Sequence, residues 1–375
     1  MPTPSSPAPP SSPSSSRLMS LDALRGFTMF WIVGAEELVR GLQKISSGGF
    51  IGLIAEQLHH KAWEGFHFED LIFPMFVFIA GVSIVFSLGR VLEKADRRAA
   101  TWRILRRAAL LYFLGILYYG GFSTPFQEIR LLGVLQRIAL SYLFAALLFL
   151  YLKPKALLGV LVGLLLGYWA LLALVPVPGH GAGNYAEGAN LANYVDQQYL
   201  PLRKHDGDHD PEGLLSTLPA IASCLLGVFA GLALRNPLSN DRQRVGQLVV
   251  AGLVCLALGW AWNPFFPVIK KIWTSSFVLV AGGYSCLFLA AFYQVIDVWK
   301  IQRWAMPFVW IGVNPILIYF GGKFIDFEAM AKLFVGGPVF VALGRYGELV
   351  LALTTLAFGF WFMRFLYQRK IFLRV

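Results

Sequence analysis

One short segment of the chain gathers side chains that can exchange protons. Residues 59–70, HHKAWEGFHFED, hold three of the six histidines and three acidic residues. Histidine changes charge near neutral pH, so it can take a proton from a reacting group or attack a carbonyl carbon itself. The apolar run LIFPMFVFIAG follows directly and has the composition of a membrane-spanning helix. Because titratable groups are costly beside hydrocarbon, this segment is the first candidate for an active site.

Within this segment, His60 is the candidate general base or nucleophile, and the competing interpretation is a group of interfacial histidines bound to water. Asp70 begins the following span, where the helix dipole favours a carboxylate. The same carboxylate can also orient His60 and stabilise its cation. No metal site is expected from His59, His60, His67 and Glu69, because adjacent histidines rarely ligate one ion and no metal-binding histidine spacing occurs.

Two arginines lie inside expected spans, each beside another polar residue. Arg25 comes three residues after Asp22, so the two share one face of a helix, and Arg137 directly follows Gln136. Such groups either stabilise the bundle or line a polar cavity. Since a buried arginine is expensive in a membrane, two of them in one bundle indicate an anionic ligand.

Further hydrogen-bond donors lie near the ends and breaks of later spans. Lys270 and Lys271, in KKIWTSS with Trp273, either snorkel to the membrane surface or point at an anionic or oxyanionic group. Asn314 precedes Pro315 within an expected span. A helix break at membrane depth is tolerated where the backbone lines protein or a cavity, and Asn314 can donate a hydrogen bond there.

The elements that must position these residues are membrane-spanning helices. The 375 residues are 57% hydrophobic and 14% charged, with a mean hydropathy of +0.61, which is too apolar for a soluble domain of this length. We therefore expect an all-α polytopic membrane bundle that forms one domain over residues 17–375. About ten runs are long enough to span a bilayer: 21–41, 70–90, 104–121, 131–152, 156–176, 214–234, 246–262, 272–297, 304–322 and 341–365.

Charge predicts how the bundle is oriented. The net charge of +11 is better explained by the cytoplasmic excess of lysine and arginine in membrane proteins than by nucleic-acid binding. The excess favours both termini in the cytoplasm, which places residues 59–70 and the loop 177–213 outside. The Pro/Ser-rich residues 1–16 are expected to form a disordered tail rather than a signal peptide. The three cysteines lie in apolar runs and are expected to be buried, not paired or metal-bound.

The outer loop contains the run HDGDHD at residues 205–210. It resembles a cation-binding segment, but it lacks the glycine at the sixth loop position and the terminal glutamate of an EF-hand loop. A solvated loop tip is therefore expected here, and no metal cofactor is expected in the protein.

Six stretches along the chain resemble, in the same order, the sequence of one family. They are SLDALRGFTMF (20–30), HHKAWEGFHFEDLIFPMFVFIAGVSI (59–84), GVLQRIALSY (133–142), DPEGLLSTLPAI (210–221), FPVIKKIWTSSFV (266–278) and IGVNPILIY (311–319). Together they resemble the transmembrane acetyltransferases related to heparan-alpha-glucosaminide N-acetyltransferase. The chain is most similar to the bacterial branch of that family, which lacks the large luminal domain of the lysosomal enzyme.

This resemblance implies an enzyme that takes the acetyl group of cytosolic acetyl-CoA and transfers it to an amine across the membrane. Counting back from Trp63, the family's proposed catalytic histidine matches His60. The resemblance also implies a homodimer, here in the inner membrane of a bacterium. Two departures matter: Pro315 stands where relatives commonly carry serine, and the short outer loop favours a small amino sugar such as glucosamine over a polymer.

Acetyl transfer to an amine needs a base, donors for the oxyanion and anchors for the CoA phosphates. We expect His60 to act as the base or to carry the acetyl group, with Asp70 as its partner and Asn314 among the candidate oxyanion donors. The residues expected to meet acetyl-CoA are Arg25, Arg106, Arg107, Gln136, Arg137, Lys270, Lys271 and Trp273. The alternatives are an amino-sugar transporter, an O-acetyltransferase acting on a cell-envelope glycan, and a membrane scaffold without chemistry.

Overall fold

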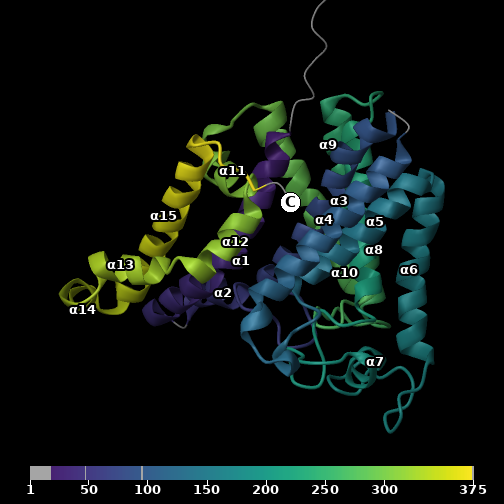
Figure 1. Cartoon of the computed structure of the whole chain (residues 1–375), viewed down its shortest axis with the longest axis horizontal. Helices are drawn as coiled ribbons and strands as arrows, with labels where there is room; N and C mark the ends of the chain where they lie inside the picture. Colours follow the sequence, from purple (N-terminus) through teal and green to yellow (C-terminus); the bar gives the residue numbers. More distant parts are fainter. Residues whose placement is uncertain (1–17, 47, 94–95, 374–375) are drawn as a thin grey trace, which may run out of the picture.

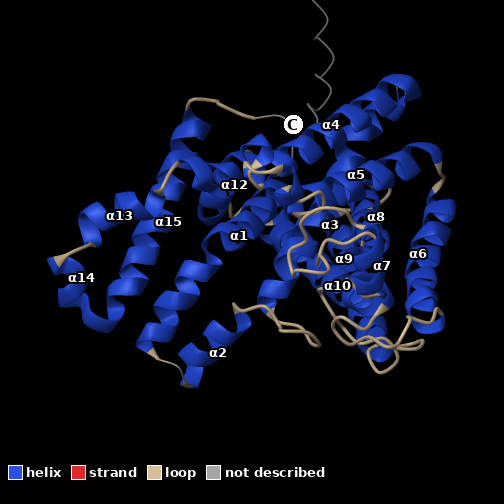
Figure 2. Ribbon diagram, turned by 60° about the horizontal axis from the view of Figure 1, so that its bottom comes forward, coloured by secondary structure: helices blue, strands red, loops and turns tan. Residues whose placement is uncertain are grey.

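The computed structural model describes residues 18–46, 48–93 and 96–373, and every regular element within these ranges is a helix (Figure 2). The expected tail, residues 1–16, lies outside the described residues. The helices of the first half are α1 (Met19–Ile45), α2 (Gly49–Gln57), α3 (Phe68–Glu93), α4 (Arg97–Tyr118), α5 (Val134–Tyr151), α6 (Pro154–Leu174) and α7 (Leu191–Tyr199). Those of the second half are α8 (Thr217–Arg235), α9 (Asp241–Trp262), α10 (Ser275–Phe292), α11 (Met306–Gly312), α12 (Pro315–Phe324), α13 (Phe327–Val335), α14 (Pro338–Leu343) and α15 (Gly347–Gln368).

Each predicted span coincides with a helix or a pair of helices, which confirms the all-helical bundle. Among the described residues, seven segments are long and apolar enough to cross a membrane, namely α3, α5, α6, α8, α9, α10 with its π-helical end, and α14 joined to α15. The pair α11 and α12 makes an eighth, and it bends by 68° at the predicted break. Helices α1 and α4 carry more charged residues than these eight, so the count of ten spans stays a prediction.

The connecting segments that contain the candidate residues come together at one end of the bundle. Figure 1 shows α7 and the loops around it at the bottom of the view, where α1, α4, α6 and α9 end and α3, α5, α8 and α10 begin. The C-terminal ends of α3, α5, α8 and α10 lie at the opposite end. This alternation is the one expected for the outer and inner faces, and the orientation in the membrane stays a prediction.

Glycines allow two pairs of helices to touch backbone to backbone. A Cβ atom on Gly81 of α3 would lie 1.9 Å from the Cys224 carbonyl oxygen of α8, and one on Gly227 would lie 1.9 Å from the Phe78 carbonyl oxygen. At the crossing of α1 and α11, a Cβ atom on Gly26 would lie 1.7 Å from a backbone oxygen. Small residues that permit such close approach are typical of membrane-helix interfaces. These crossings fix the positions of α1 and α3 along the bundle axis, and with them the positions of the polar residues on both helices.

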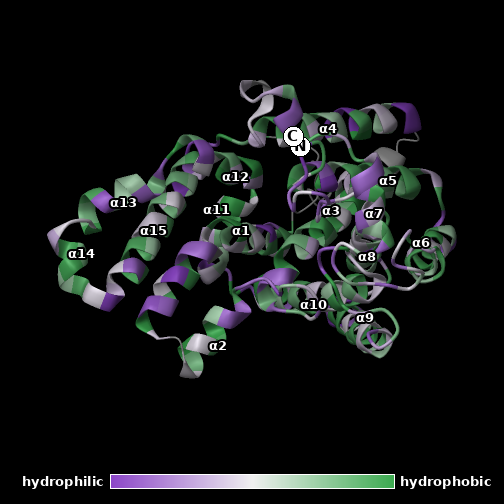
Figure 3. Cartoon of the chain, turned by 90° about the horizontal axis from the view of Figure 1, so that it is seen from below, coloured by the Kyte–Doolittle hydropathy of each residue, from purple (hydrophilic) through white to green (hydrophobic). Residues whose placement is uncertain are grey.

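Apolar side chains cover the outside of the bundle. In Figure 3, α6 and α9 lie at the rim of the molecule, and many of their residues are coloured as hydrophobic. Exposed side chains recur at helical spacing, for example Leu158, Val162 and Leu166 on α6. A soluble protein would cover such a surface, whereas hydrocarbon is a favourable neighbour for it. The pattern agrees with a multi-pass membrane protein.

Candidate active site

His60 lies in the segment between α2 and α3, and Asp70 lies in the first turn of α3. The Nδ1 atom of His60 is 3.1 Å from Oδ1 of Asp70. The other carboxylate oxygen of Asp70 accepts hydrogen bonds from the backbone N–H groups of Lys61 and His67. Asp70 is fully buried, while the His60 side chain is 58% exposed. The carboxylate is thus held rigidly, and one edge of the imidazole remains open.

The backbone brings the His60 segment against the loop between α9 and α10. Glu64 and Ile269 form an isolated β-bridge, and the Gly65 N–H donates to the Val268 carbonyl oxygen at 2.9 Å. Gly65 adopts φ +113°, a conformation that a side chain disfavours. This contact places Lys270, one residue after the bridge, beside His60.

Lys270 completes the cluster around His60. Its Nζ atom lies 2.9 Å from Nδ1 and 3.3 Å from Nε2 of His60, and 3.5 Å from Oδ1 of Asp70. Burial lowers the pKa of the Lys270 ammonium, and the charges of Asp70, Glu69 and Glu212 oppose this effect. Nδ1 cannot donate to the carboxylate and accept from the ammonium at once. When Nδ1 carries the proton and donates it to Asp70, the lone pair of the ring is on Nε2. Nε2 then faces Lys270 and solvent.

Glu69 is a further acid of this cluster. Its Oε2 atom is buried and has no hydrogen-bond partner in the described part of the chain. A buried polar atom without a partner is costly, so it indicates a position that a ligand group can satisfy. From the sequence, Glu69 was recognised as part of the segment that contains His60, but no separate role was predicted for it.

A buried ion network lies next to this cluster at the same end of the bundle. Arg130 binds Asp210 through two hydrogen bonds of 2.9 and 2.7 Å and also binds Glu212. Burial alone would lower the pKa of the Arg130 guanidinium, but Asp210 and Glu212 outweigh burial and raise that pKa. These three residues were not recognised as a set from the sequence. The available signal was DPEG, whose charges stand directly before an apolar span.

The same network corrects the expectation for residues 205–210. His209 and Asp210 are buried, so the prediction of a solvated loop tip is wrong for them. Asp210 is drawn inward by Arg130, and its Oδ2 atom also accepts the His205 N–H. The loop 177–213 is therefore tied to the bundle at this point.

Three predicted residues form a second cluster behind the network. Arg137 is 1% exposed, donates to the Gly213 carbonyl oxygen and to Ser216, and lies 4.9 Å from the ring centre of Trp273. Its Nε and Nη1 atoms and the Oε1 atom of Gln136 are buried and lack partners among the residues that the structure describes. Trp273 has φ +52°, and its indole N–H donates to Ser223. Strained backbone and unsatisfied polar atoms together favour a ligand-binding role.

A cavity of about 280 Å³ lies between α1, α3, α4, α5 and α12, and two more predicted residues line it. Arg25 and Arg107 both line it, together with residues of α3, α5 and α12. Arg25 donates to Asp22, Ser83 and the Gly312 carbonyl oxygen. Arg106 points elsewhere and is exposed on α4.

Two predicted residues lie apart from His60. Lys271 directs its ammonium at Glu187 and Asp206 of the loop 177–213, at 2.7 and 3.1 Å. Asn314 is fully buried at the bend between α11 and α12, where its amide binds the C-terminal segment. It donates to the Ile371 carbonyl oxygen at 2.7 Å and accepts the Leu373 N–H at 3.0 Å. Both ends of the Asn314 amide thus bind the C-terminal segment, and its role as an oxyanion donor stays a prediction.

Replacing Asn314 with alanine should release the C-terminal segment without removing chemistry. The change leaves the Ile371 carbonyl and the Leu373 N–H without partners, at a cost of about 2 kcal/mol. We expect faster proteolysis after α15 and a slightly lower thermal midpoint, with catalytic activity at saturating substrate retained. A complete loss of activity in a folded Asn314→Ala protein would contradict this expectation and support Asn314 as an oxyanion donor.

Asp196 of α7 makes stability depend on pH. Its oxygens accept the Leu214 and Asp210 N–H groups, but burial dominates and raises its pKa from 3.8 to about 6. Between these values the folded chain holds a proton that the unfolded chain has lost, so stability rises as pH falls. Going from pH 7 to pH 5 should add about 1 kcal/mol through this group. Thermal midpoints should show this gain in the wild type and not in Asp196→Asn, and equal pH responses would contradict it.

Fold and site together define a multi-pass helical membrane protein with a histidine–carboxylate–lysine cluster at one end of its bundle. A family model described as "Heparan-alpha-glucosaminide N-acetyltransferase, catalytic" matches residues 17–254. The chain therefore belongs to this family, which confirms the resemblance seen in the sequence.

Two curated proteins support the same relationship. Human heparan-alpha-glucosaminide N-acetyltransferase is 30% identical over 326 residues, covering 71% of this chain and 49% of that protein. The mouse protein of the same name is 27% identical over 325 residues, with the same coverage of each chain. The chain thus spans about half the length of the curated relatives it matches.

Proposed function

We propose that the chain is a membrane-embedded acetyltransferase that moves the acetyl group of acetyl-CoA to the amine of a glucosamine-type sugar. The observation that carries the proposal is the contact of His60 with both Asp70 and Lys270 at one end of the bundle. Membership in an N-acetyltransferase family supports the reaction class. The acceptor is taken from the names of the relatives and from the short outer loop.

His60 acts at Nε2 in this proposal. Asp70 accepts the Nδ1 proton, so the lone pair stands on the exposed edge of the ring. The amine of the acceptor attacks the thioester carbon, the carbon–sulfur bond breaks, and the proton lost by nitrogen passes through Nε2 to the CoA thiolate. In the alternative order, Nε2 first attacks the thioester and carries the acetyl group to the amine.

Lys270 is the proposed donor to the oxyanion. It is the lysine whose ammonium contacts His60, whereas Lys271 is directed at Glu187 and Asp206. A positive charge fixed at 3 Å or so from the reacting edge stabilises the negative oxygen of a tetrahedral intermediate. Glu69, with its unsatisfied buried oxygen, is the proposed partner of the acceptor's ammonium before it loses its proton.

The donor is proposed to enter from the opposite end of the bundle. Arg25 and Arg107 line the 280 Å³ cavity, whose size suits the pantetheine arm rather than a whole CoA molecule. Arg106 and the basic residues before it would then meet the phosphates outside the cavity. Gln136, Arg137 and Trp273 lie beyond the cavity, and Gln136 and Arg137 supply unsatisfied polar atoms for the end of the arm.

Thiol release tests the proposal. Purified protein in detergent receives acetyl-CoA with glucosamine, with other amino sugars, or with a sugar that offers only hydroxyl groups. Release that depends on an amine supports N-acetyl transfer, and one equivalent released without acceptor indicates an acetyl-histidine. Release with the hydroxyl acceptor alone would favour O-acetylation, and no release at all would favour a transporter, for which the bent pair α11–α12 beside the cavity is the supporting feature.

Arg107 should matter for the donor and not for the acceptor. Arg107→Gln removes one positive charge from the cavity, so we expect the KM for acetyl-CoA to rise about tenfold while the KM for glucosamine is unchanged. Arg242, exposed on α9 at the same end of the bundle, provides the matched control as Arg242→Gln. Equal effects of both substitutions on acetyl-CoA would place the donor path elsewhere.

A further inference from the structure

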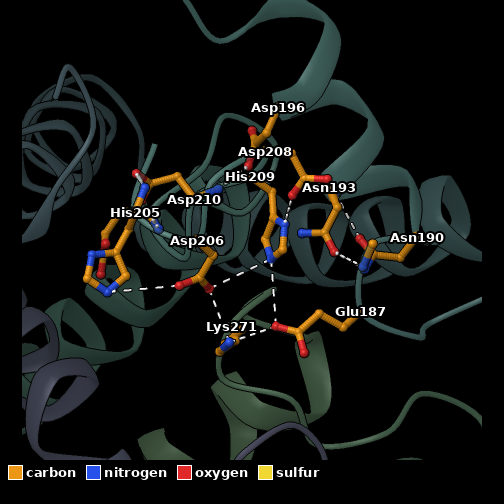
Figure 4. A network of polar contacts seen from close by, with 12 residues as sticks. Glu187, Asn190, Asn193, Asp196, His205, Asp206, Asp208, His209, Asp210 and Lys271 are labelled. Carbon is orange, nitrogen blue, oxygen red and sulfur yellow. Dashed lines mark hydrogen bonds and ion pairs between the residues drawn. The ribbon is translucent and has the colours of Figure 1, made fainter. Parts of the chain in front are cut away.

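Three side chains with metal-binding atoms meet in the outer loop, away from His60. Figure 4 shows Glu187, Asp206 and His209 directed at a common point. The Nε2 atom of His209 lies 3.8 Å from Oε1 of Glu187 and 3.7 Å from Oδ2 of Asp206. All three ligand atoms lie within 4.8 Å of one another. These residues are spread over 23 positions of the chain, so spacing along the sequence did not reveal them.

His209 is held in a fixed orientation that exposes its Nε2 atom to the carboxylates. The residue is 5% exposed, and its Nδ1 atom lies 2.6 Å from Oδ1 of Asp208. With the proton on Nδ1, a lone pair on Nε2 faces two carboxylates, and Nε2 has no hydrogen-bond partner in the described ranges. A lone pair facing carboxylate oxygens is unfavourable unless a cation or a proton lies between them. A carboxylate behind a metal-bound histidine is also a common supporting contact, and Asp208 itself accepts a hydrogen bond from Gln197.

The distances fit a first-row divalent ion. Ligand atoms about 2.1 Å from a tetrahedral zinc ion lie about 3.4 Å apart, so the His209 separations need to close by only a few tenths of an ångström. One imidazole nitrogen with two carboxylates suits zinc better than magnesium or calcium, which prefer oxygen ligands alone. Three protein ligands leave a fourth position for water.

Lys271 competes for this position. Its ammonium lies 2.7 Å from Glu187 and 3.1 Å from Asp206, so it already neutralises part of their charge. A divalent ion bound between the same oxygens must displace the ammonium. Because Lys270, the next residue back, contacts His60, displacement of Lys271 would be felt at the candidate active site.

We propose that Glu187, Asp206 and His209 form a binding site for a divalent transition metal of the zinc type, in competition with the Lys271 ammonium. The proposal does not rest on the proposed acetyl transfer. It differs from the expectation of a protein without metal, which rested on the histidine spacing in residues 59–70 and on the EF-hand features missing from residues 205–210.

Equilibrium dialysis of the full chain, tag-free and stripped with chelator, against zinc chloride tests the site. We expect one zinc per chain, with His209→Ala weakening binding at least about tenfold and Asp208→Asn weakening it about tenfold. Lys271→Met should tighten binding about tenfold, because the competing charge is gone. His205→Ala is the matched control. This histidine belongs to the same loop, but its side chain is 61% exposed. The affinity of the His205→Ala variant for zinc should therefore equal that of the wild type.

The competition with Lys271 keeps the test decisive even if one variant misfolds. A thermal midpoint for each variant identifies misfolding, and Lys271→Met retains all three ligands. Zinc binding that survives in folded His209→Ala, or that is unchanged in Lys271→Met, would overturn the proposal. If zinc binds neither the wild type nor Lys271→Met, the proposal would be overturned. Binding of magnesium or calcium in preference to zinc would overturn the assigned metal class.

Discussion

Replacing His60 with alanine should lower the rate of acetyl transfer by about 10²–10⁴-fold, the range that a general base contributes. The reason is the geometry around the ring, in which Asp70 takes the Nδ1 proton and Nε2 is left to act. Because the His60 side chain is more than half exposed, its removal should leave stability almost unchanged. The measurement is the acceptor-dependent release of CoA at saturating acetyl-CoA.

His59 provides the matched control for this prediction. It is the adjacent residue, it is exposed, and its Nε2 atom lies 2.7 Å from the Gln43 amide rather than near Asp70. His59→Ala should therefore retain nearly full activity. The activity of Asp70→Asn should lie between those of His59→Ala and His60→Ala. The imidazole keeps its place in this variant, but it loses the group that fixes its tautomer. Equal losses at His59 and His60 would point to a disturbed segment instead of a catalytic residue.

Replacing Arg130 with alanine should destabilise the fold by about 3–5 kcal/mol. The substitution leaves the carboxylates of Asp210 and Glu212 buried without their counter-ion. Burial already raises the pKa of the Glu212 carboxyl, with Arg137 and Arg130 opposing, so losing one of the two arginines favours its protonation. We expect a much lower thermal midpoint that partly recovers in mild acid.

Arg203 tests whether this effect depends on burial. It also pairs with an acid, Glu128 at 3.4 Å, but the two side chains are 63% and 54% exposed. Exposed pairs contribute about 0–1 kcal/mol, so Arg203→Ala should leave the thermal midpoint nearly unchanged. Similar midpoints for Arg130→Ala and Arg203→Ala would contradict the role given to the buried network.

Long apolar runs made the helices predictable, because a backbone in hydrocarbon must satisfy its own hydrogen bonds. Contacts between residues that are close along the chain were equally predictable. His60 and Asp70 are ten residues apart, and the turn into α3 brings them together. Arg25 and Asp22 likewise meet on one helix face.

Contacts between distant segments were not predictable from one sequence. Lys270 reaches His60 across 210 positions, and Arg130 reaches Asp210 across 80. Both depend on how the loops at one end of the bundle fold over each other. The sequence also could not tell which of several donors face the reacting group. Asn314 suited an oxyanion chemically, but the C-terminal segment already uses its amide.

The most direct test of the account is a mass balance on isotope-labelled acetyl-CoA. Wild-type protein in detergent is incubated with acetyl-labelled acetyl-CoA and glucosamine, and both products are quantified by mass spectrometry. The account predicts CoA and labelled N-acetylglucosamine in equal amounts, and at least about 100-fold slower formation of both products by folded His60→Ala. Folded wild-type protein that binds acetyl-CoA but forms no labelled N-acetylglucosamine, or equal product from His60→Ala, would contradict it.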